Sequence, residues 1–211
     1  MSTDATTPRP APRSGKRQAI LDGALTLFAR DGYTRASLDG IAAAAGVSVR
    51  TIYNHFPDKA QLFLAVILDG SRRVADVQID VIDRHLRKIV DLEADLVDFG
   101  LDWLAVLDSD LALHFALVRQ INAEAEHIPA DAYRAWQEAG PLRVRRHLAD
   151  RLRRVAALGH LQTADPERAA LHLTLLLSVG GLTRSCDFGT PAERRATVEA
   201  GVHAFLHGYA A

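Results

Sequence analysis

The sequence has little cysteine and no long apolar run, and each absence narrows the class of protein. Cys186 is the single cysteine, which excludes an intramolecular disulfide and is typical of a reducing compartment. No apolar run approaches the roughly 18 residues of a membrane-spanning helix, so we expect no membrane partner. Residues 1–15 are rich in Thr, Pro, Ser and Arg and lack the apolar segment of a signal peptide. We therefore expect a disordered tail on a cytoplasmic protein.

The sequence also lacks the groupings of common catalytic and cofactor sites. We find no paired carboxylates, no nucleophile with a partner base and no glycine-rich phosphate loop. His203 and His207 have a spacing that suits zinc, but no third ligand is identifiable. Cys186 has no evident histidine or acid partner. We expect no catalytic residue, no metal and no cofactor, so an enzyme is not expected.

The net charge of −1 hides an uneven distribution along the 211 residues. Residues 1–60 contain eight Lys/Arg and five Asp/Glu, a net charge of +3, whereas the remaining residues carry seventeen against twenty-one, or −4. A basic module on an acidic body is suited to binding phosphate at one end. Arg9, Arg13, Lys16 and Arg17 either form an arm that follows a nucleic-acid backbone or belong to an ordinary solvated tail.

The stretch from Ser37 to Lys59 carries the clearest local pattern. Apolar residues recur on one face of a short helix that Ser37 can cap, namely Leu38, Ile41, Ala42 and Ala45. Gly46 can adopt the left-handed conformation that ends a helix, and Ser48 can cap a second helix. Ile52 and Phe56 would point inward from that second helix. Two short helices joined by a tight turn predict a helix-turn-helix.

The outward face of the second helix has the side chains of a DNA-reading surface. Arg50 can contact guanine, Asn54 can pair with adenine, and Val49 can touch a thymine methyl group. The other polar residues of this module are suited to phosphate oxygens, and they are Ser37, Thr51, Tyr53, His55 and Lys59. The sequence therefore predicts double-stranded DNA as a partner.

Residues 46–62, GVSVRTIYNHFPDKAQL, resemble the DNA-binding motif of the TetR family of transcriptional regulators. The family pattern A-G-V-S-x-x-T-[LI]-Y, its aromatic position and its lysine are matched by Ala45, Gly46, Val47, Ser48, Thr51, Ile52, Tyr53, Phe56 and Lys59. Arg50 stands where the family often has Gly, so its base contact is not carried over from the resemblance. Beyond the first third of the chain, the resemblance lies in length and helical layout.

Helical periodicity without strand alternation continues through the rest of the chain, which predicts an all-α protein. We expect a first helix from Lys16 to Asp31 and a long helix that starts after Pro57 and Asp58 and continues towards Arg84. Further helices are expected at residues 92–107, 110–126, 131–158 with a bend at Gly140 and Pro141, 166–183 and 191–207. The domains are then a tail at 1–15, a DNA-binding domain at 16–58, and an effector-binding and dimerisation domain at 59–211.

The helix expected at residues 166–183 is apolar around most of its circumference, so one covered face does not bury it. The interpretation we favour is a homodimer that buries this helix and the last one in a four-helix interface, as the resemblance also implies; the alternative is a core helix of a monomer. The expected interface residues are Leu173, Leu177, Gly180, Gly181, Val198, Val202 and Phe205. Two-fold symmetry predicts an inverted-repeat operator.

The middle helices carry large apolar and aromatic side chains that are either ordinary core or, as the resemblance implies, the lining of an effector cavity. The candidates are Phe99, Trp103, Leu107, His114, Phe115, Val118 and Trp136. The arginines between Arg143 and Arg154 favour a solvated amphipathic face over a second nucleic-acid surface, since leucines interleave with them.

The sequence thus predicts a ligand-responsive regulator that is a repressor released from DNA by a small, mostly apolar effector. The alternatives are an activator, an effector-independent DNA-binding protein, and a small-molecule binding protein without DNA function.

Overall fold

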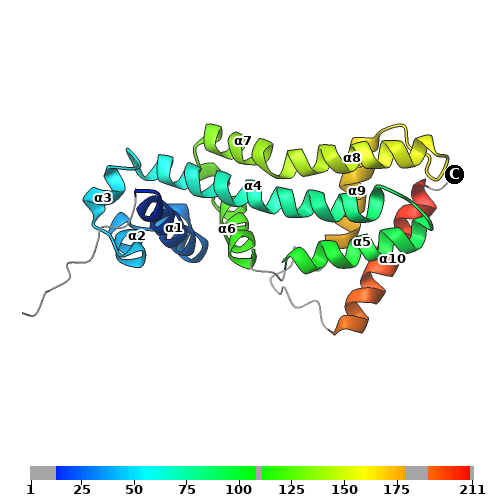
Figure 1. Ribbon diagram of the computed structural model, residues 1–211, viewed down its shortest axis with the longest axis horizontal. Coiled ribbons are helices and arrows are strands. Elements are labelled where there is room, and N and C mark those ends of the chain that lie inside the picture. The colour runs from blue at the N-terminus through cyan, green and yellow to red at the C-terminus, as the bar shows by residue number, and fades with distance from the viewer. Residues whose placement is uncertain (1–12, 108–110, 179–189, 210–211) are drawn as a thin grey trace, which may run out of the picture. The chain divides into compact units, whose positions relative to one another are not determined.

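The computed structural model describes residues 13–107, 111–178 and 190–209, and these form helices without a β-strand, which confirms the all-α class (Figure 1). No helix in these ranges is both long and apolar enough to cross a membrane. The elements in chain order are α1 (Arg13–Arg35), α2 (Leu38–Ala45), α3 (Val49–Tyr53), α4 (Lys59–Leu86), α5 (Leu92–Leu107), α6 (Ala112–Ala123), the 3₁₀ turn η1 (Ala125–His127), α7 (Ala130–Ala139), α8 (Pro141–Ala157), α9 (Pro166–Ser178) and α10 (Pro191–Tyr209).

The chain forms two compact units that are discontinuous in sequence. Unit 1 contains residues 1–67 and 116–129, and unit 2 contains residues 68–115 and 130–211. Helices α4 and α6 therefore each contribute residues to both units. Unit 1 is larger than the DNA-binding segment 16–58 expected from the sequence, because the start of α4 and the end of α6 pack with it.

The core of unit 1 is built by the apolar faces of α1 to α4. Phe28 of α1 and Phe63 of α4 are fully buried, and their rings meet edge to face with centroids 5.0 Å apart. Tyr33 packs on the same Phe63 ring at 4.8 Å. Burying one phenylalanine of this kind contributes about 1.5–3 kcal/mol. This aromatic cluster holds α1 and α4 as a rigid support for the two short helices.

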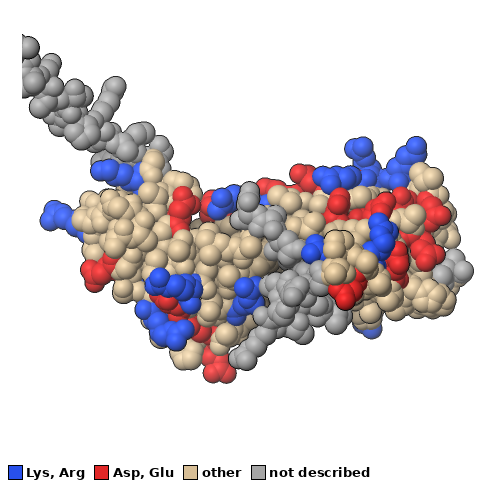
Figure 2. Space-filling view, turned by 90° about the horizontal axis from the view of Figure 1, so that it is seen from below, with Lys and Arg blue, Asp and Glu red and all other residues tan. Residues whose placement is uncertain are grey.

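The core of unit 2 is formed by α5, α8, α9 and α10 with the C-terminal half of α4. Helix α8 buries Leu148, Leu152 and Val155, as an amphipathic helix requires. Four of its arginines are exposed, namely Arg143, Arg146, Arg153 and Arg154, and the other two are half-buried. Three of these arginines form ion pairs at 2.8 Å, Arg143 with Asp76, Arg146 with Glu138, and Arg151 with Asp83. On the face shown in Figure 2, acidic and basic side chains likewise intermingle over the body. The three ion pairs of α8 support its amphipathic interpretation over a second nucleic-acid surface.

Several helix bounds differ from the sequence expectation. The helix expected at residues 131–158 is two helices, α7 and α8, because the backbone of Gly140 leaves the helical region at φ −126° and ψ −91°. The first helix starts earlier and continues to Arg35 across a non-helical Gly32, with φ 80° and ψ 174°. The bounds of α5 agree with the prediction.

Five of the seven residues expected at the dimer interface are buried within the single chain. These residues are at most 1% exposed, and they are Leu173, Leu177, Val198, Val202 and Phe205. They pack between α9, α10 and the rest of unit 2. Gly180 and Gly181 lie outside the described residues, as does Cys186. The leucines that α9 does expose are Leu171 and Leu175.

Candidate nucleic-acid interface

A capped turn joins α2 to α3 in unit 1. The Ser37 hydroxyl accepts a hydrogen bond from the backbone N–H of Gly40 at 3.1 Å and so caps α2. At the other end Gly46 is left-handed, with φ 63° and ψ 34°. The N–H of Gly46 donates to Ala43 at 3.2 Å and the N–H of Val47 to Ala42 at 3.0 Å. These bonds satisfy carbonyls that a helix end leaves free, and they fix the direction in which the chain leaves α2.

Helix α3 begins directly after this turn and is anchored at both ends. The Ser48 hydroxyl accepts the N–H of Thr51 at 3.2 Å, and its oxygen lies 2.9 Å from the Thr51 hydroxyl. Ile52 and Phe56 are buried, as predicted. The guanidinium carbon of Arg17 lies 5.4 Å from the centroid of the Phe56 ring. Because caps and core fix the inward face of α3, its opposite face has a defined orientation.

The predicted DNA-contacting residues lie in unit 1, on α3 and next to it. Arg50, Tyr53 and Asn54 are exposed, and Tyr53 has 53% of its surface accessible. Such exposure is unusual for a large aromatic side chain and leaves its hydroxyl free to reach a partner. Half-buried positions are occupied by Val49, Thr51 and His55. The face therefore combines one cation, one amide and hydroxyl or imidazole groups, the chemistry that contacts base edges and phosphates.

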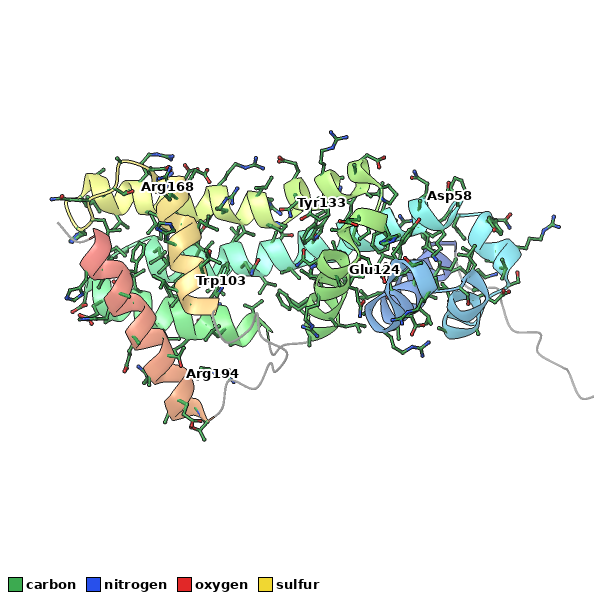
Figure 3. The ribbon with its side chains drawn as sticks, turned by 180° about the vertical axis from the view of Figure 1, so that it is seen from behind. Asp58, Trp103, Glu124, Tyr133, Arg168 and Arg194 are labelled. Atoms are coloured by element: carbon green, nitrogen blue, oxygen red, sulfur yellow. The ribbon has the colours of Figure 1, made fainter. Side chains whose placement is uncertain are left out.

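Lys59 has a structural contact that the sequence did not indicate. Its Nζ donates to the carbonyl oxygen of Thr34 at 3.1 Å and lies 5.0 Å from the centroid of the Tyr33 ring. Partial burial lowers the pKa of the Lys59 ammonium, while the negative charge of Glu124 acts in the opposite direction. The neighbouring Asp58 caps α4 by accepting the N–H of Gln61 at 2.7 Å (Figure 3). Lys59 thus ties the start of α4 to the end of α1.

Glu124, which follows α6, completes this junction and was missed by the sequence reasoning (Figure 3). Its Oε2 accepts the Thr34 backbone N–H at 2.9 Å and the Thr34 hydroxyl at 3.0 Å. Gly32 makes the approach feasible, since a Cβ there would overlap Oε1 of Glu124 and the local φ of 80° also suits glycine. Glu124 is separated from Thr34 by 90 positions, so no local pattern could reveal the contact.

The residues expected to bind an effector are divided between the two units. Phe99 and Trp103 pair at 5.5 Å inside the α5, α9 and α10 core, whereas Val118 belongs to unit 1. The Leu107 side chain lies outside the described residues. His114 and Trp136 are buried in unit 2, and Phe115 is half-buried beside His114.

Three buried polar atoms of α4, α6 and α7 in unit 2 have no hydrogen-bond partner among the described residues: Ser71 Oγ, His114 Nδ1 and Trp136 Nε1. Their residues are at most 5% exposed. Burial, with a smaller effect of the Arg73 charge, lowers the pKa of His114 from 6.5 to about 4, so its imidazole is neutral at neutral pH. Ser71 was not singled out in the sequence, because a lone serine on an amphipathic helix carries no signal until its burial is known.

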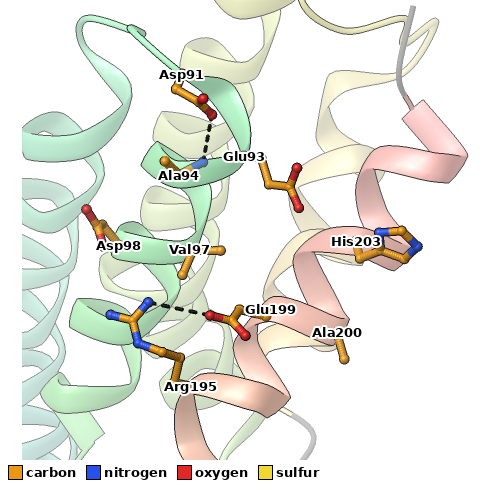
Figure 4. Close-up of a pocket in the computed structure, with 9 residues that line it drawn as sticks. All are labelled: Asp91, Glu93, Ala94, Val97, Asp98, Arg195, Glu199, Ala200 and His203. Carbon is orange, nitrogen blue, oxygen red and sulfur yellow. Dashed lines mark hydrogen bonds and ion pairs between the residues drawn. The ribbon is translucent and has the colours of Figure 1, made fainter. Parts of the chain in front are cut away.

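An open groove of about 630 Å³ lies elsewhere in unit 2, between α5 and α10 (Figure 4). Its rim is mainly acidic, with Asp91, Glu93, Asp98 and Glu199, and Glu199 lies 3.5 Å from Arg195. Asp91 accepts the N–H of Ala94 at 3.0 Å and so caps α5. None of the predicted effector residues lines this groove.

Two family models match this chain in the regions just described. Residues 20–66 match bacterial regulatory proteins of the tetR family. Residues 94–211, more than half of the chain, match the C-terminal domain of AefR-like transcriptional repressors. The chain belongs to the TetR family. Its helix-turn-helix is therefore that of a DNA-binding transcriptional regulator.

Individual TetR-family relatives agree with this placement. A regulator of Mesorhizobium loti has a structure with a TM-score of 0.81 and 30% identity, covering 96% of this chain and 100% of that one. The flavonoid-responsive regulator FrrA gives a TM-score of 0.62 and 29% identity over 93% and 98% of the two chains. The repressor AcnR of Corynebacterium glutamicum is 41% identical over 64 residues, 30% of this chain and 34% of AcnR. The matched region thus spans about a third of the length of the curated relatives.

Proposed function

We propose that the protein is a homodimeric repressor that binds an inverted-repeat operator and is released by a small effector. The observation that carries the proposal is the face of α3, on which Arg50, Tyr53 and Asn54 are exposed while caps and core residues fix the helix behind them. A rigid helix with free polar side chains on its outer face is what entry into a major groove requires.

In this proposal some side chains of the face contact bases and others contact phosphates. Arg50 donates to a guanine edge, Asn54 pairs with adenine and Val49 meets a thymine methyl group. Tyr53 and His55 contact phosphates, together with the hydroxyls of Ser37 and Thr51, which each retain bonding capacity beyond their caps. Lys59 donates one of its three ammonium N–H groups to the Thr34 carbonyl, which leaves the other two for a phosphate. Affinity should fall steeply with salt, because bound phosphates release counterions.

The proposed dimer uses the exposed side of α9 instead of its buried leucines. Leu171 and Leu175 are one helical turn apart, and 37% and 46% of their surfaces are accessible. Large apolar side chains aligned on one helix face are typical of a surface that a partner covers. A second copy of the chain is the partner that two-fold symmetry requires for an inverted repeat.

The proposed release by an effector rests on unit 2. Its buried histidine, tryptophan and serine leave polar atoms without partners among the described residues, and such atoms are rare in native proteins. The name of FrrA describes that relative as flavonoid-responsive, which supports an aromatic effector for this chain as well. The proposed place of action is the cytoplasm, where a bacterial regulator meets the chromosome.

The test is selection of bound fragments from a genomic DNA library at moderate salt. Wild-type protein is compared with Arg50→Ala, Tyr53→Phe and, as a matched control, Arg87→Ala, which removes an exposed arginine of unit 2. Wild type and Arg87→Ala should recover the same inverted repeat. Arg50→Ala should lose about 1–3 kcal/mol of base discrimination at one position, and Tyr53→Phe should bind all sequences more weakly.

Recovery of salt-labile, sequence-independent binding alone, or equal selection by the Arg50→Ala protein, would contradict this assignment. Transcription in vitro from a promoter that carries the selected operator then separates repression from activation. A rise in the amount of transcript on adding the protein would show that it is an activator and not a repressor.

A further inference from the structure

Two histidines lie one turn apart on an exposed face of α10. His203 and His207 are both exposed, and the centroids of their rings are 3.8 Å apart with the ring planes at 45°. Their spacing of four positions places both side chains on the same face of the helix, which is the arrangement in which two histidines of one helix bind zinc. Neither the DNA-contacting face of α3 nor the proposed effector response uses this pair.

A hydrogen bond fixes which ring nitrogen His207 presents to a ligand. Its Nδ1 lies 2.9 Å from the backbone carbonyl oxygen of His203. A carbonyl oxygen only accepts, so Nδ1 of His207 carries the proton and donates it. In the neutral ring the free lone pair is then on Nε2. Histidines that bind metals almost always donate their other N–H, often to a backbone carbonyl, so this bond holds His207 in the form of a metal ligand.

The surroundings of the two histidines favour a positive ion. His203 is one of the residues that line the groove between α5 and α10, whose rim is mainly acidic (Figure 4). Glu199, which belongs to that rim, is one helical turn before His203. The pair also lies in the last two turns of α10, which ends at Tyr209, and the C-terminal end of a helix carries a partial negative charge. Both effects attract a cation.

We propose that His203 and His207 form a two-histidine site for a divalent transition-metal ion on α10. Nε2 of His207 is one ligand, and a ring nitrogen of His203, brought to the ion by side-chain rotation, is the other. Imidazole nitrogens suit zinc, copper and nickel, whereas magnesium and calcium take oxygen ligands. In the part of the chain that the structure describes, no group of three His, Cys, Asp or Glu side chains is placed to hold a metal, so water completes the coordination. The site goes beyond the proposed function, because it needs neither operator nor effector.

The experiment titrates the purified full-length protein with nickel chloride by calorimetry, and with magnesium chloride as the comparison. Wild type should bind Ni²⁺ and should show no comparable binding of Mg²⁺, because the acidic groove alone would not distinguish the two ions. His203→Ala and His207→Ala should each weaken Ni²⁺ binding about tenfold or more, since each removes one of two ligands. His160→Ala is the matched control: it removes an exposed histidine that follows α8 and should bind Ni²⁺ as wild type does.

Thermal unfolding separates metal binding from folding. Alanine is a good helix former and both positions are exposed, so without metal the two variants should unfold near the wild-type temperature. Ni²⁺ should raise the unfolding temperature of wild type and of His160→Ala, because it binds the folded helix, and should leave that of His203→Ala and His207→Ala unchanged. Equal Ni²⁺ affinity in wild type and both variants, binding of Mg²⁺ as tight as that of Ni²⁺, or no binding of Ni²⁺ by wild type would overturn the proposal.

Discussion

The buried histidine of unit 2 should make the protein less stable in mild acid by a predictable amount. His114 has a folded-state pKa of about 4 against an ordinary 6.5, because burial disfavours the charged imidazolium. Between these values the unfolded chain binds a proton that the folded chain does not, so stability is full above pH 6.5 and falls as the pH drops towards 4. The full shift corresponds to about 3 kcal/mol, of which about 2 kcal/mol is lost between about pH 8 and pH 5.

Urea unfolding at these two pH values measures the effect. Wild type should lose about 2 kcal/mol more than a His114→Leu protein, which has no group to titrate at this position. His160→Leu is the control, since His160 is exposed after α8 and its loss should leave the wild-type pH dependence intact. Hydrogen bonds lower the pKa values of carboxylates such as Asp102, and acid removes the stability that these carboxylates contribute equally in all three proteins. An identical loss in wild type and His114→Leu would refute the argument.

Three further changes test other parts of the structure. In Gly46→Ala the new side chain meets no atom within 4 Å, but an alanine at φ 63° is strained, so thermal unfolding should show a free energy of unfolding about 1 kcal/mol lower. Gly208→Ala is the control, because Gly208 also faces open space but is helical, and this change should not destabilise the protein. Glu124→Ala should destabilise the protein by about 1–3 kcal/mol, because the Thr34 N–H loses its acceptor. Glu126→Ala is the control, since Glu126 is exposed, and equal unfolding temperatures of the two variants would count against this contact. Leu175→Glu should shift the protein to a monomer in sedimentation velocity; a dimer that persists would place the interface elsewhere.

The local parts of the DNA-binding unit were predictable from the sequence because their causes are local. A serine before a helix, a glycine after it and apolar residues at helical spacing each act within a few positions, and the caps at Ser37, Ser48 and Gly46 formed accordingly. The side chains placed on the outer face of α3 followed from the same periodicity.

Other features depend on which helix covers which face, and periodicity does not contain that information. The apolar circumference of α9 indicated two covered sides, yet it did not show that Leu173 and Leu177 face the chain's own core and Leu175 does not. Gly140 was expected to bend a helix and instead separates two. Ser71 became notable only through its burial without a partner among the described residues.

The discontinuity of unit 1 has a practical consequence for hybrid regulators. A DNA-binding segment cut after Ile67 and fused to a foreign body would leave behind residues 116–129, and with them the carboxylate of Glu124. Thr34 would then lose the acceptor of its N–H, and no carboxylate would occupy the space that Gly32 leaves open by having no side chain. A transplant that preserves specificity therefore needs two sequence segments, or a donor body whose α6 supplies an acid at the same place.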